Sequence, residues 1–316
     1  MGKQIENIFK HTPVLLNECI EGLNIKSNGI YVDGTLGGGG HSSEILKRLT
    51  TGKLIAFDKD EDALSTTKVK LDNYKDKIIY IKDDFKNMVK DLSEIEISGV
   101  DGILLDLGVS SYQIDTAERG FSYRFDGKLD MRMDKSASLT AFQVVNTYSR
   151  EELIRILYNY GEENFAKNIV NKIIEVRSEK PIETTGELVS IVESSIPKKF
   201  WGKGNVAKKT FQAIRIEVNG ELDGLEDAIS SMIDILNIGG RIAIITFHSL
   251  EDRIVKNVFK EHSVNCICDK SLPFCVCNHV ADGVLVNKKP IEASKEELEN
   301  NSRSSCAKLR IFEKTR

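Results

Sequence analysis

Short apolar runs alternate with amphipathic stretches from Gly29 to Leu107, which is the pattern of a parallel α/β sheet. Strands covered on both faces are apolar throughout, and the amphipathic intervals supply the helices that connect parallel strands. This part of the chain is therefore predicted to form a doubly wound half-sheet. The four expected strands are Ile30–Val32, Leu54–Phe57, Ile78–Ile81 and Ile103–Leu105.

The strand pattern stops near Asp115, and only helix signals follow until about Val206. Capping boxes, in which a Ser or Thr precedes a Glu by three residues, open two apolar-periodic segments at Ser149 and Thr184. This block is interpreted as a helical insertion in the sheet.

After the insertion, an amphipathic helix is expected over Leu222–Leu236, ending where Gly239 and Gly240 suit a helix C-cap. A further helix is expected over Leu250–Lys260. The returning strands are expected at Arg241–Thr246 and Lys308–Phe312.

Length and composition fit one large α/β domain with a second unit inserted in it. The chain has 316 residues, with 41% hydrophobic and 29% charged residues, as in folded globular proteins. The N-terminus carries no apolar signal segment and no apolar run could span a bilayer, so we expect a cytoplasmic protein without membrane contact. The expected division is 1–114 and 207–316 for the α/β domain and 115–206 for the helical domain.

A glycine-rich turn follows the first expected strand and precedes a helix. Asp33 ends the strand, and five glycines lie between it and His41, where backbone amides approach a nucleotide-like ligand closely. Asp58 ends the second strand at the position that binds ribose hydroxyls in Rossmann-type sites. The alternatives are a merely flexible turn and a solvated carboxylate.

A nicotinamide-dependent dehydrogenase shares this pattern and is the rival enzyme. Asp33 favours a methyltransferase, because an acid beside the loop repels a pyrophosphate but suits the amino group of S-adenosylmethionine. Ser42 stands where the last glycine of a dinucleotide fingerprint would lie, and Phe85 can flank an adenine. Titration with each cofactor would separate the two readings.

Two residues are candidates for the reacting centre. Asp106 ends the fourth strand at the carboxyl edge, where open α/β sheets bind ligands, and a loop-capping role is its alternative. His248 is the second candidate. Its alternative is a structural position before a helix with Ser249 as N-cap and Asp252 as first-turn acid.

The formal net charge of −4 argues against indiscriminate nucleic-acid binding, so any RNA surface must be local. Lys198–Arg215 combines five lysines, one arginine and three aromatic residues without an acid, and Arg119–Arg132 is a second basic, aromatic loop. A solvated loop with Phe211 in the core is the alternative for the first segment. The candidate RNA contacts are Arg119, Arg124, Arg132, Lys198, Lys199, Trp201, Lys208, Lys209 and Arg215.

Several long sequence motifs, in the same order along the chain, resemble those of the bacterial ribosomal RNA small-subunit methyltransferase H family. The resemblance covers essentially the whole chain. Tyr112 departs from the family, which usually has proline there, and residues 301–305 depart from a more proline- and arginine-rich motif. The matching strings are His11–Leu16, Asp33–His41, Asp106–Ser111, Glu118–Ser122, Asp130–Asp134, Thr210–Arg215 and Thr246–Arg253.

The resemblance implies a Rossmann-like class I methyltransferase with a mostly parallel seven-stranded sheet and an inserted helical domain. It implies S-adenosylmethionine as donor and the N4 amine of a decoding-centre cytidine in 16S ribosomal RNA as acceptor, within the small ribosomal subunit. By the family's pattern, the cofactor contacts are Gly39, Gly40, His41, Asp58, Phe85, Asp106 and Gln113.

Four of the six cysteines form two C-x-C pairs, and four thiolates can complete a tetrahedral zinc site. The spacing is less typical than C-x-x-C, so free, reduced thiols remain an alternative. A zinc-dependent RNA-binding module is the rival from another class, but it would not need the glycine turn or Asp58. The candidate ligands are Cys266, Cys268, Cys275 and Cys277.

Overall fold

The computed structural model describes residues 13–202, 204–269, 272 and 274–316, and these divide into two compact units. One unit is discontinuous and contains the chain up to Gly108 together with Gly224–Arg316; the other is Val109–Asp223. His11 and Thr12 of the first family string lie outside the described residues. None of the helices described is long and apolar enough to cross a bilayer.

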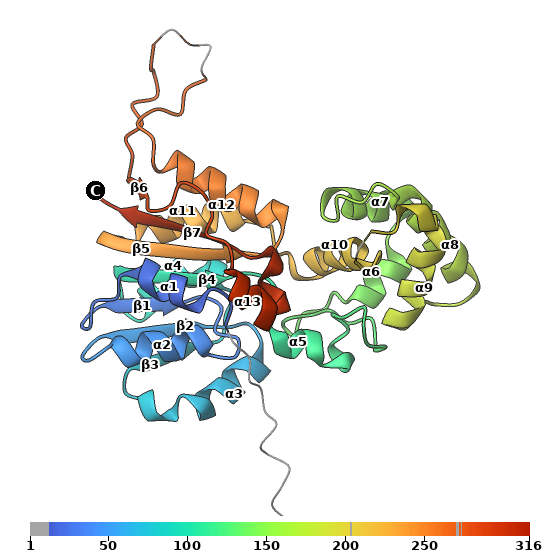
Figure 1. Cartoon of the computed structure of the whole chain (residues 1–316), viewed down its shortest axis with the longest axis horizontal. Helices are drawn as coiled ribbons and strands as arrows, with labels where there is room; N and C mark the ends of the chain where they lie inside the picture. Colours follow the sequence, from blue (N-terminus) through green and yellow to red (C-terminus); the bar gives the residue numbers. More distant parts are fainter. Residues whose placement is uncertain (1–12, 203, 270–271, 273) are drawn as a thin grey trace, which may run out of the picture. The chain divides into compact units, whose positions relative to one another are not determined.

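The discontinuous unit is built on a seven-stranded sheet in the order β3-β2-β1-β4-β5-β7-β6 (Figure 1). Among the strands that the structure describes, β7 alone runs opposite to the direction that the others share, so the prediction of a mostly parallel, Rossmann-like, seven-stranded sheet is confirmed. The strands are β1 (Ile30–Asp33), β2 (Lys53–Phe57), β3 (Ile78–Ile81), β4 (Val100–Asp106), β5 (Leu236–Thr246), β6 (Gly283–Leu285) and β7 (Lys308–Lys314).

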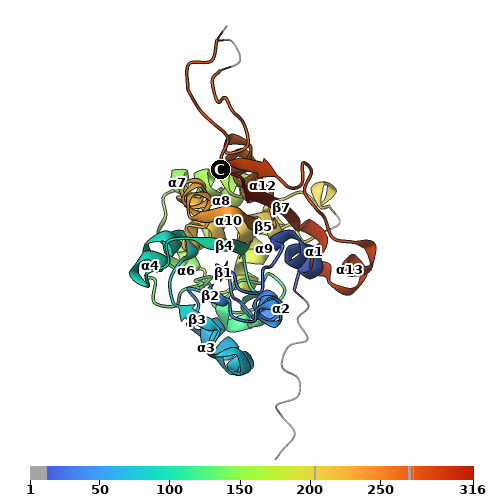
Figure 2. The same ribbon diagram turned by 90° about the vertical axis from the view of Figure 1, so that its left-hand side faces the viewer.

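Helices cover both faces of this sheet, and α1 and α2 lie opposite α4 (Figure 2). On the face covered by α1 and α2, buried side chains of these helices pack with Leu104, Ala243 and Ile245 in one hydrophobic cluster. Ile103 and Leu105 are also fully buried and point to the other face, because side chains alternate along a strand. The helices of the unit are α1 (Leu16–Leu23), α2 (Gly40–Arg48), α3 (Glu61–Lys70), α4 (Met88–Glu94), α11 (Leu225–Asp234), α12 (Ser249–Glu261) and α13 (Lys295–Asn300).

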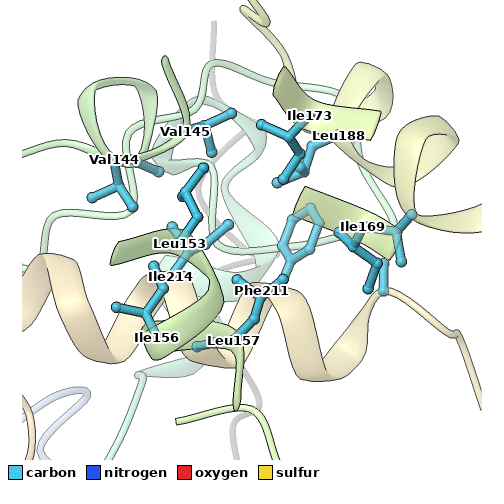
Figure 3. Close-up of a cluster of buried hydrophobic side chains, with 14 of the residues drawn as sticks. Val144, Val145, Leu153, Ile156, Leu157, Ile169, Ile173, Leu188, Phe211 and Ile214 are labelled. Atoms are coloured by element: carbon cyan, nitrogen blue, oxygen red, sulfur yellow. The ribbon is translucent and has the colours of Figure 1, made fainter. Parts of the chain in front are cut away.

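The second unit is helical and has a hydrophobic core of its own (Figure 3). The two predicted capping boxes are confirmed, because Ser149 and Thr184 each accept a hydrogen bond from the amide three residues ahead. Its helices are α5 (Ser111–Asp115), α6 (Ala141–Thr147), α7 (Arg150–Asn159), α8 (Ala166–Glu179), α9 (Thr185–Ser195) and α10 (Lys208–Asn219).

The limits of the helical unit differ from the expected 115–206. Helix α10 was expected in the α/β domain, but its Phe211 and Ile214 are buried in the helical core beside Leu153, as Figure 3 shows. The helical unit is therefore larger than the stretch without strand signals, because α10 contributes an apolar face to it.

The expected glycine C-cap of the helix before β5 is wrong. Helix α11 ends at Asp234, and β5 begins at Leu236, so Gly239 lies within the strand. Gly239 has a φ of 78° and lies where the pairing of β5 with β4 shifts register between Val100 and Gly102. Its conformational freedom thus serves an irregularity in the strand.

Candidate active site

The glycine turn follows β1 and is tied to the two strands that flank β1, namely β4 and β2. The Gly34 amide donates to the Leu104 carbonyl at 2.9 Å, and the Leu36 amide donates to the Phe57 carbonyl at 2.9 Å. Gly39, at the N-terminus of α2, has a φ of 67°, and a Cβ there would lie 2.4 Å from Cγ2 of Thr67. Only glycine meets both demands, so the turn is held in a fixed shape at a helix N-terminus.

Asp33 is buried beneath this turn and has 1% of its surface exposed. Its Oδ1 accepts from the Thr35 amide at 3.1 Å, and its Oδ2 accepts from the Ser42 hydroxyl at 2.6 Å. Burial raises the pKa of Asp33 to about 6. The side chain therefore braces the turn against α2, and a contact with an amino group would require a further hydrogen bond to the same oxygens.

Asp58 holds the turn from the end of β2. Its Oδ2 accepts from the Gly37 amide and its Oδ1 from the Asp60 amide, each at 2.8 Å. Burial, opposed by these two hydrogen bonds, raises the pKa of Asp58 to about 6. Phe85 opens the short helix after β3 and packs near Gly34, where a Cβ would lie 3.1 Å from that of Phe85. The predicted cofactor residues of this unit thus gather at the carboxyl edge of β1, β2 and β4.

Asp106 ends β4, next to β1, where the order of the strands reverses. Its amide donates to the Thr35 hydroxyl at 2.6 Å, and its Oδ2 lies 3.9 Å from Nδ1 of His41. Its Oδ1 is buried and has no hydrogen-bond partner among the residues described. Burial, together with the charges of Asp33 and Glu251, raises the pKa of Asp106 to about 8.

His41 lies at the start of α2 with 6% of its surface exposed. Its Nε2 is 3.1 Å from the Val14 carbonyl, which can only accept, so Nε2 carries the proton. The other ring nitrogen is the one nearer to Asp106. The side chain therefore links the segment before α1 to the end of β4.

His248 is itself the N-cap of α12, so the expectation that Ser249 caps this helix is wrong. The Glu251 amide donates to Nδ1 of His248 at 3.4 Å, while Oε2 of Glu251 accepts from the Phe247 amide at 2.9 Å. Nε2 of His248 lies 3.2 Å from Oε1 of Glu251 but without hydrogen-bond geometry. This reciprocal arrangement supports the structural role of His248, and a chemical role stays a prediction.

Gln113 belongs to the helical unit and is described there by itself. Ser110 and Gln113 form a capping box at the start of α5, in which Oε1 of Gln113 accepts from the Ser110 amide at 3.0 Å. The side chain is buried, with 4% exposed. Its predicted contact with the cofactor stays a prediction.

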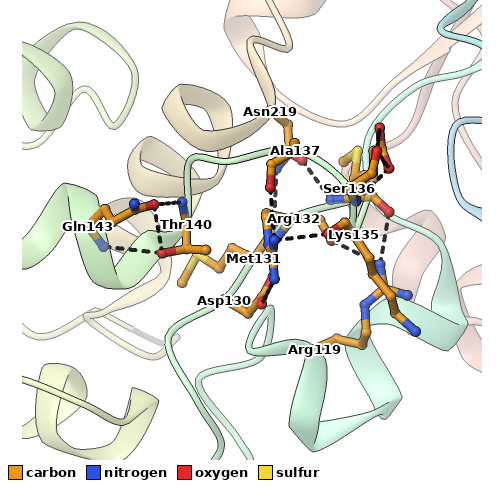
Figure 4. A network of polar contacts seen from close by, with 12 residues as sticks. Arg119, Asp130, Met131, Arg132, Lys135, Ser136, Ala137, Thr140, Gln143 and Asn219 are labelled. Atoms are coloured by element: carbon orange, nitrogen blue, oxygen red, sulfur yellow. Dashed lines mark hydrogen bonds and ion pairs between the residues drawn. The ribbon is translucent and has the colours of Figure 1, made fainter.

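Two of the candidate RNA-binding arginines are used inside the helical unit (Figure 4). Arg119 is 5% exposed and donates to the carbonyls of Arg132 and Met133 at 2.9 and 3.0 Å. Arg132 pairs with Asp130 at 2.6 Å and donates to the carbonyls of residues 135 and 137. These guanidiniums organise the loop that sequence reasoning placed on an RNA surface.

Arg215 is likewise engaged, because its guanidinium forms two hydrogen bonds of 2.8 Å to Glu221. Trp201 donates from Nε1 to the Ile196 carbonyl while 38% of its surface stays exposed. Lys203 lies outside the described residues. The exposed basic candidates are Arg124, Lys198, Lys199, Lys208 and Lys209.

The four cysteines of the C-x-C pairs are brought together, with all four Sγ atoms within 4.8 Å of one another.

The sequence did not predict that Thr35, Ser42 and Thr67 support the glycine turn. Thr67 donates from its hydroxyl to the Gly37 carbonyl at 2.9 Å. A single threonine in an amphipathic helix gives no sequence signal of such a contact.

Comparisons with known proteins assign nearly the whole chain to one family. The model of the MraW methylase family matches residues 8–315. Proteins called ribosomal RNA small subunit methyltransferase H from Finegoldia magna, Clostridium botulinum and Clostridioides difficile are 58%, 56% and 52% identical to this chain. Each alignment covers 97% of this chain and 99% of the relative. The chain therefore belongs to the MraW methylase family of methyltransferases.

Proposed function

We propose that this protein transfers a methyl group from S-adenosylmethionine to the N4 amine of a decoding-centre cytidine in 16S ribosomal RNA. The names of its relatives support a small-subunit ribosomal RNA as substrate. The observation that carries the chemistry is the buried, unpartnered Oδ1 of Asp106 at the edge of β4, beside the glycine turn. Such a substrate would place the reaction in the cytoplasm.

When bound, S-adenosylmethionine supplies a methyl group on a positively charged sulfur. The carboxyl groups of buried Asp33 and of partly exposed Asp58 and Asp106 form an acidic site that would favour a cationic ligand. Gly39, Gly40 and His41, at the start of α2, are the residues proposed to lie along the rest of the cofactor, as the backbone of a glycine turn permits close approach.

The N4 amine of cytosine is a weak nucleophile, because its lone pair is delocalised into the ring. A new N4–carbon bond forms as the sulfur–carbon bond breaks, and N4 loses one proton. Oδ1 of Asp106 is proposed to accept a hydrogen bond from the amine, which orients the lone pair and provides a path for that proton. Positioning would supply most of the rate.

The protonation state of Asp106 fits this role. With a pKa of about 8, its carboxyl group is mostly neutral at pH 7. A positive charge beside it would lower that pKa and produce the carboxylate form, which is the form that accepts from the amine. Cofactor binding and readiness to accept a proton would thus be coupled at one residue.

The RNA is proposed to contact the exposed basic residues of the helical unit. The four consecutive residues 198–201 are two lysines, Phe200 and Trp201, and all of them are exposed. Phe200 has 56% of its surface exposed. Lysine and exposed aromatic side chains provide phosphate contacts and base stacking. Arg119, Arg132 and Arg215 would instead stabilise the unit that presents them.

The test is methyl transfer to small ribosomal subunits that lack the modification, with S-adenosylmethionine labelled in its methyl group. The modified nucleoside is then mapped by nuclease digestion and mass spectrometry. We expect one labelled N4-methylcytidine, and subunits that already carry the mark should take up no label. Label on another atom or base would contradict the proposed acceptor. Calorimetry that shows binding of a nicotinamide dinucleotide but not of S-adenosylmethionine would contradict the proposed donor.

A further inference from the structure

The described residues of 263–281, which follow α12 and precede β6, extend away from the sheet of their unit and are called the finger below (Figure 1). Its base is closed by polar contacts. The Asp282 amide donates to the His262 carbonyl at 2.8 Å, and the His262 ring lies between Oδ2 of Asp282 at 2.6 Å and the Ser230 hydroxyl at 3.1 Å. The two arms of the finger therefore leave the sheet from a fixed point.

The residues described in the finger form no hydrophobic core that could hold its two arms together. None of its described residues is buried, and large apolar side chains such as Phe274 and Val276 are 80% and 72% exposed. A segment of this size that cannot bury apolar surface needs a cross-link, either covalent or through a metal ion.

The thiols converge where such a cross-link would be made. Each arm carries one C-x-C pair, and Sγ of Cys277 lies 3.6 Å from that of Cys275 and 4.0 Å from that of Cys266. Four sulfurs placed about 2.3 Å from a tetrahedral zinc ion are roughly 3.8 Å apart. The Val276 amide also donates to Sγ of Cys268 at 3.4 Å, a type of contact that orients and stabilises thiolate ligands.

From this convergence we propose that Cys266, Cys268, Cys275 and Cys277 bind one zinc ion that holds the finger together. Four thiolates complete the coordination and leave no open position, so the ion is structural and takes no part in methyl transfer. Soft thiolate ligands select zinc over magnesium or calcium. This site does not depend on the proposed substrate or donor.

Metal content of the full-length protein tests the site directly. Protein purified without chelators and dialysed should retain about one zinc per chain, as four cysteine ligands complete one site. A C275S/C277S double variant should lose that zinc, while a C306S variant, which removes an exposed cysteine outside the cluster, should keep it. Cobalt(II) added to the zinc-free parent should give the absorption bands of tetrahedral thiolate coordination, a readout that does not depend on the variants folding.

Three results would overturn the proposal: parent protein without stoichiometric zinc, equal zinc in the parent and the double variant, or a cobalt spectrum of octahedral oxygen coordination. Disulfides within the cluster would appear in the intact mass as the loss of two hydrogens per bridge, and they would also overturn it. Limited proteolysis should show faster cleavage between residues 263 and 281 after zinc removal. Cleavage of the finger that is unaffected by zinc would contradict the holding role.

Discussion

Replacing Asp106 by asparagine is expected to stabilise the fold at neutral pH while it lowers turnover. The folded-state pKa of Asp106 is about 8, against an ordinary value of 3.8. A raised carboxyl pKa means that ionisation opposes folding. The loss of free energy of unfolding begins above the pKa of the unfolded state, grows with pH and is complete above the pKa of the folded state. At about pH 7 the gap of roughly three pH units corresponds to roughly 4 kcal/mol.

Asparagine cannot ionise, but one atom of its amide would take the buried place of Oδ1, and unmet hydrogen bonds there cost roughly 1–3 kcal/mol. The net gain in free energy of unfolding should therefore be roughly 1–3 kcal/mol near pH 7. Near pH 4 the ionisation cost is nearly absent and the unmet hydrogen bonds remain, so the variant should be less stable than the parent by roughly 1–3 kcal/mol. Methyl transfer at saturating cofactor and RNA should fall by roughly 10²-fold, because one positioned acceptor is lost at the reacting centre.

Urea unfolding followed by circular dichroism at about pH 5 and about pH 8 measures the effect on stability. Asp101, at the other end of β4, is the matched control. Burial opposes its ionisation, but hydrogen bonds from the Ile30 amide and Lys26 outweigh it and lower the pKa of Asp101. D101N should therefore destabilise the protein to the same extent at both pH values, because both lie above the ordinary pKa of 3.8. A D106N variant less stable than the parent at both pH values would refute the reasoning.

Three further substitutions test other parts of the site. D58A should weaken S-adenosylmethionine binding in calorimetry by ~1.5–3 kcal/mol, through loss of a charge-assisted acceptor, and unchanged affinity would remove Asp58 from the site. K198A/K199A should weaken binding to small subunits and flatten its salt dependence; a salt slope equal to that of the parent would speak against phosphate contacts. R119M should lower the free energy of unfolding by roughly 1–3 kcal/mol, since two buried carbonyls lose their donor. Unaltered unfolding would show that Arg119 does not hold its loop.

The buried parallel strands are predictable from the sequence because burial on both faces leaves a continuous apolar signal. Leu54–Phe57 lies within β2 and is buried throughout, and the strands that end in Asp33 and Asp106 lie where expected. β6 has only three residues, too few to show a pattern of any period. Gly239 shows another limit, since the same residue type serves a helix end and a strand irregularity, and only the pairing with β4 decides between them.

The cofactor edge is predictable because topology alone brings the ends of β1, β2 and β4 together. The roles of single charged residues are not. Arg119 and Arg132 lie in a loop whose basic and aromatic composition is typical of RNA binding. Both side chains donate instead to backbone carbonyls, which only the folded structure places within reach. His248 has a low intrinsic preference for the N-cap position, so sequence rules favour Ser249. Tertiary packing around Glu251 reverses that choice.

The discontinuous sheet has a consequence for synthesis of the protein. β4 pairs with β5, yet β5 begins about 130 residues later in the chain, and a flexible loop of that length carries a large closure entropy. During translation, β1–β4 emerge with the pairing edge of β4 open, which is the kind of edge that recruits other strands. The intervening helices have their own core and can fold first. Asn219 donates to the Met131 carbonyl and accepts from the Met133 amide, and these hydrogen bonds tie the last helix back to an early loop. Once the helical unit has folded, fewer flexible residues connect β4 to β5. The entropy lost when these two strands pair is then smaller, so folding of the helical unit favours completion of the sheet.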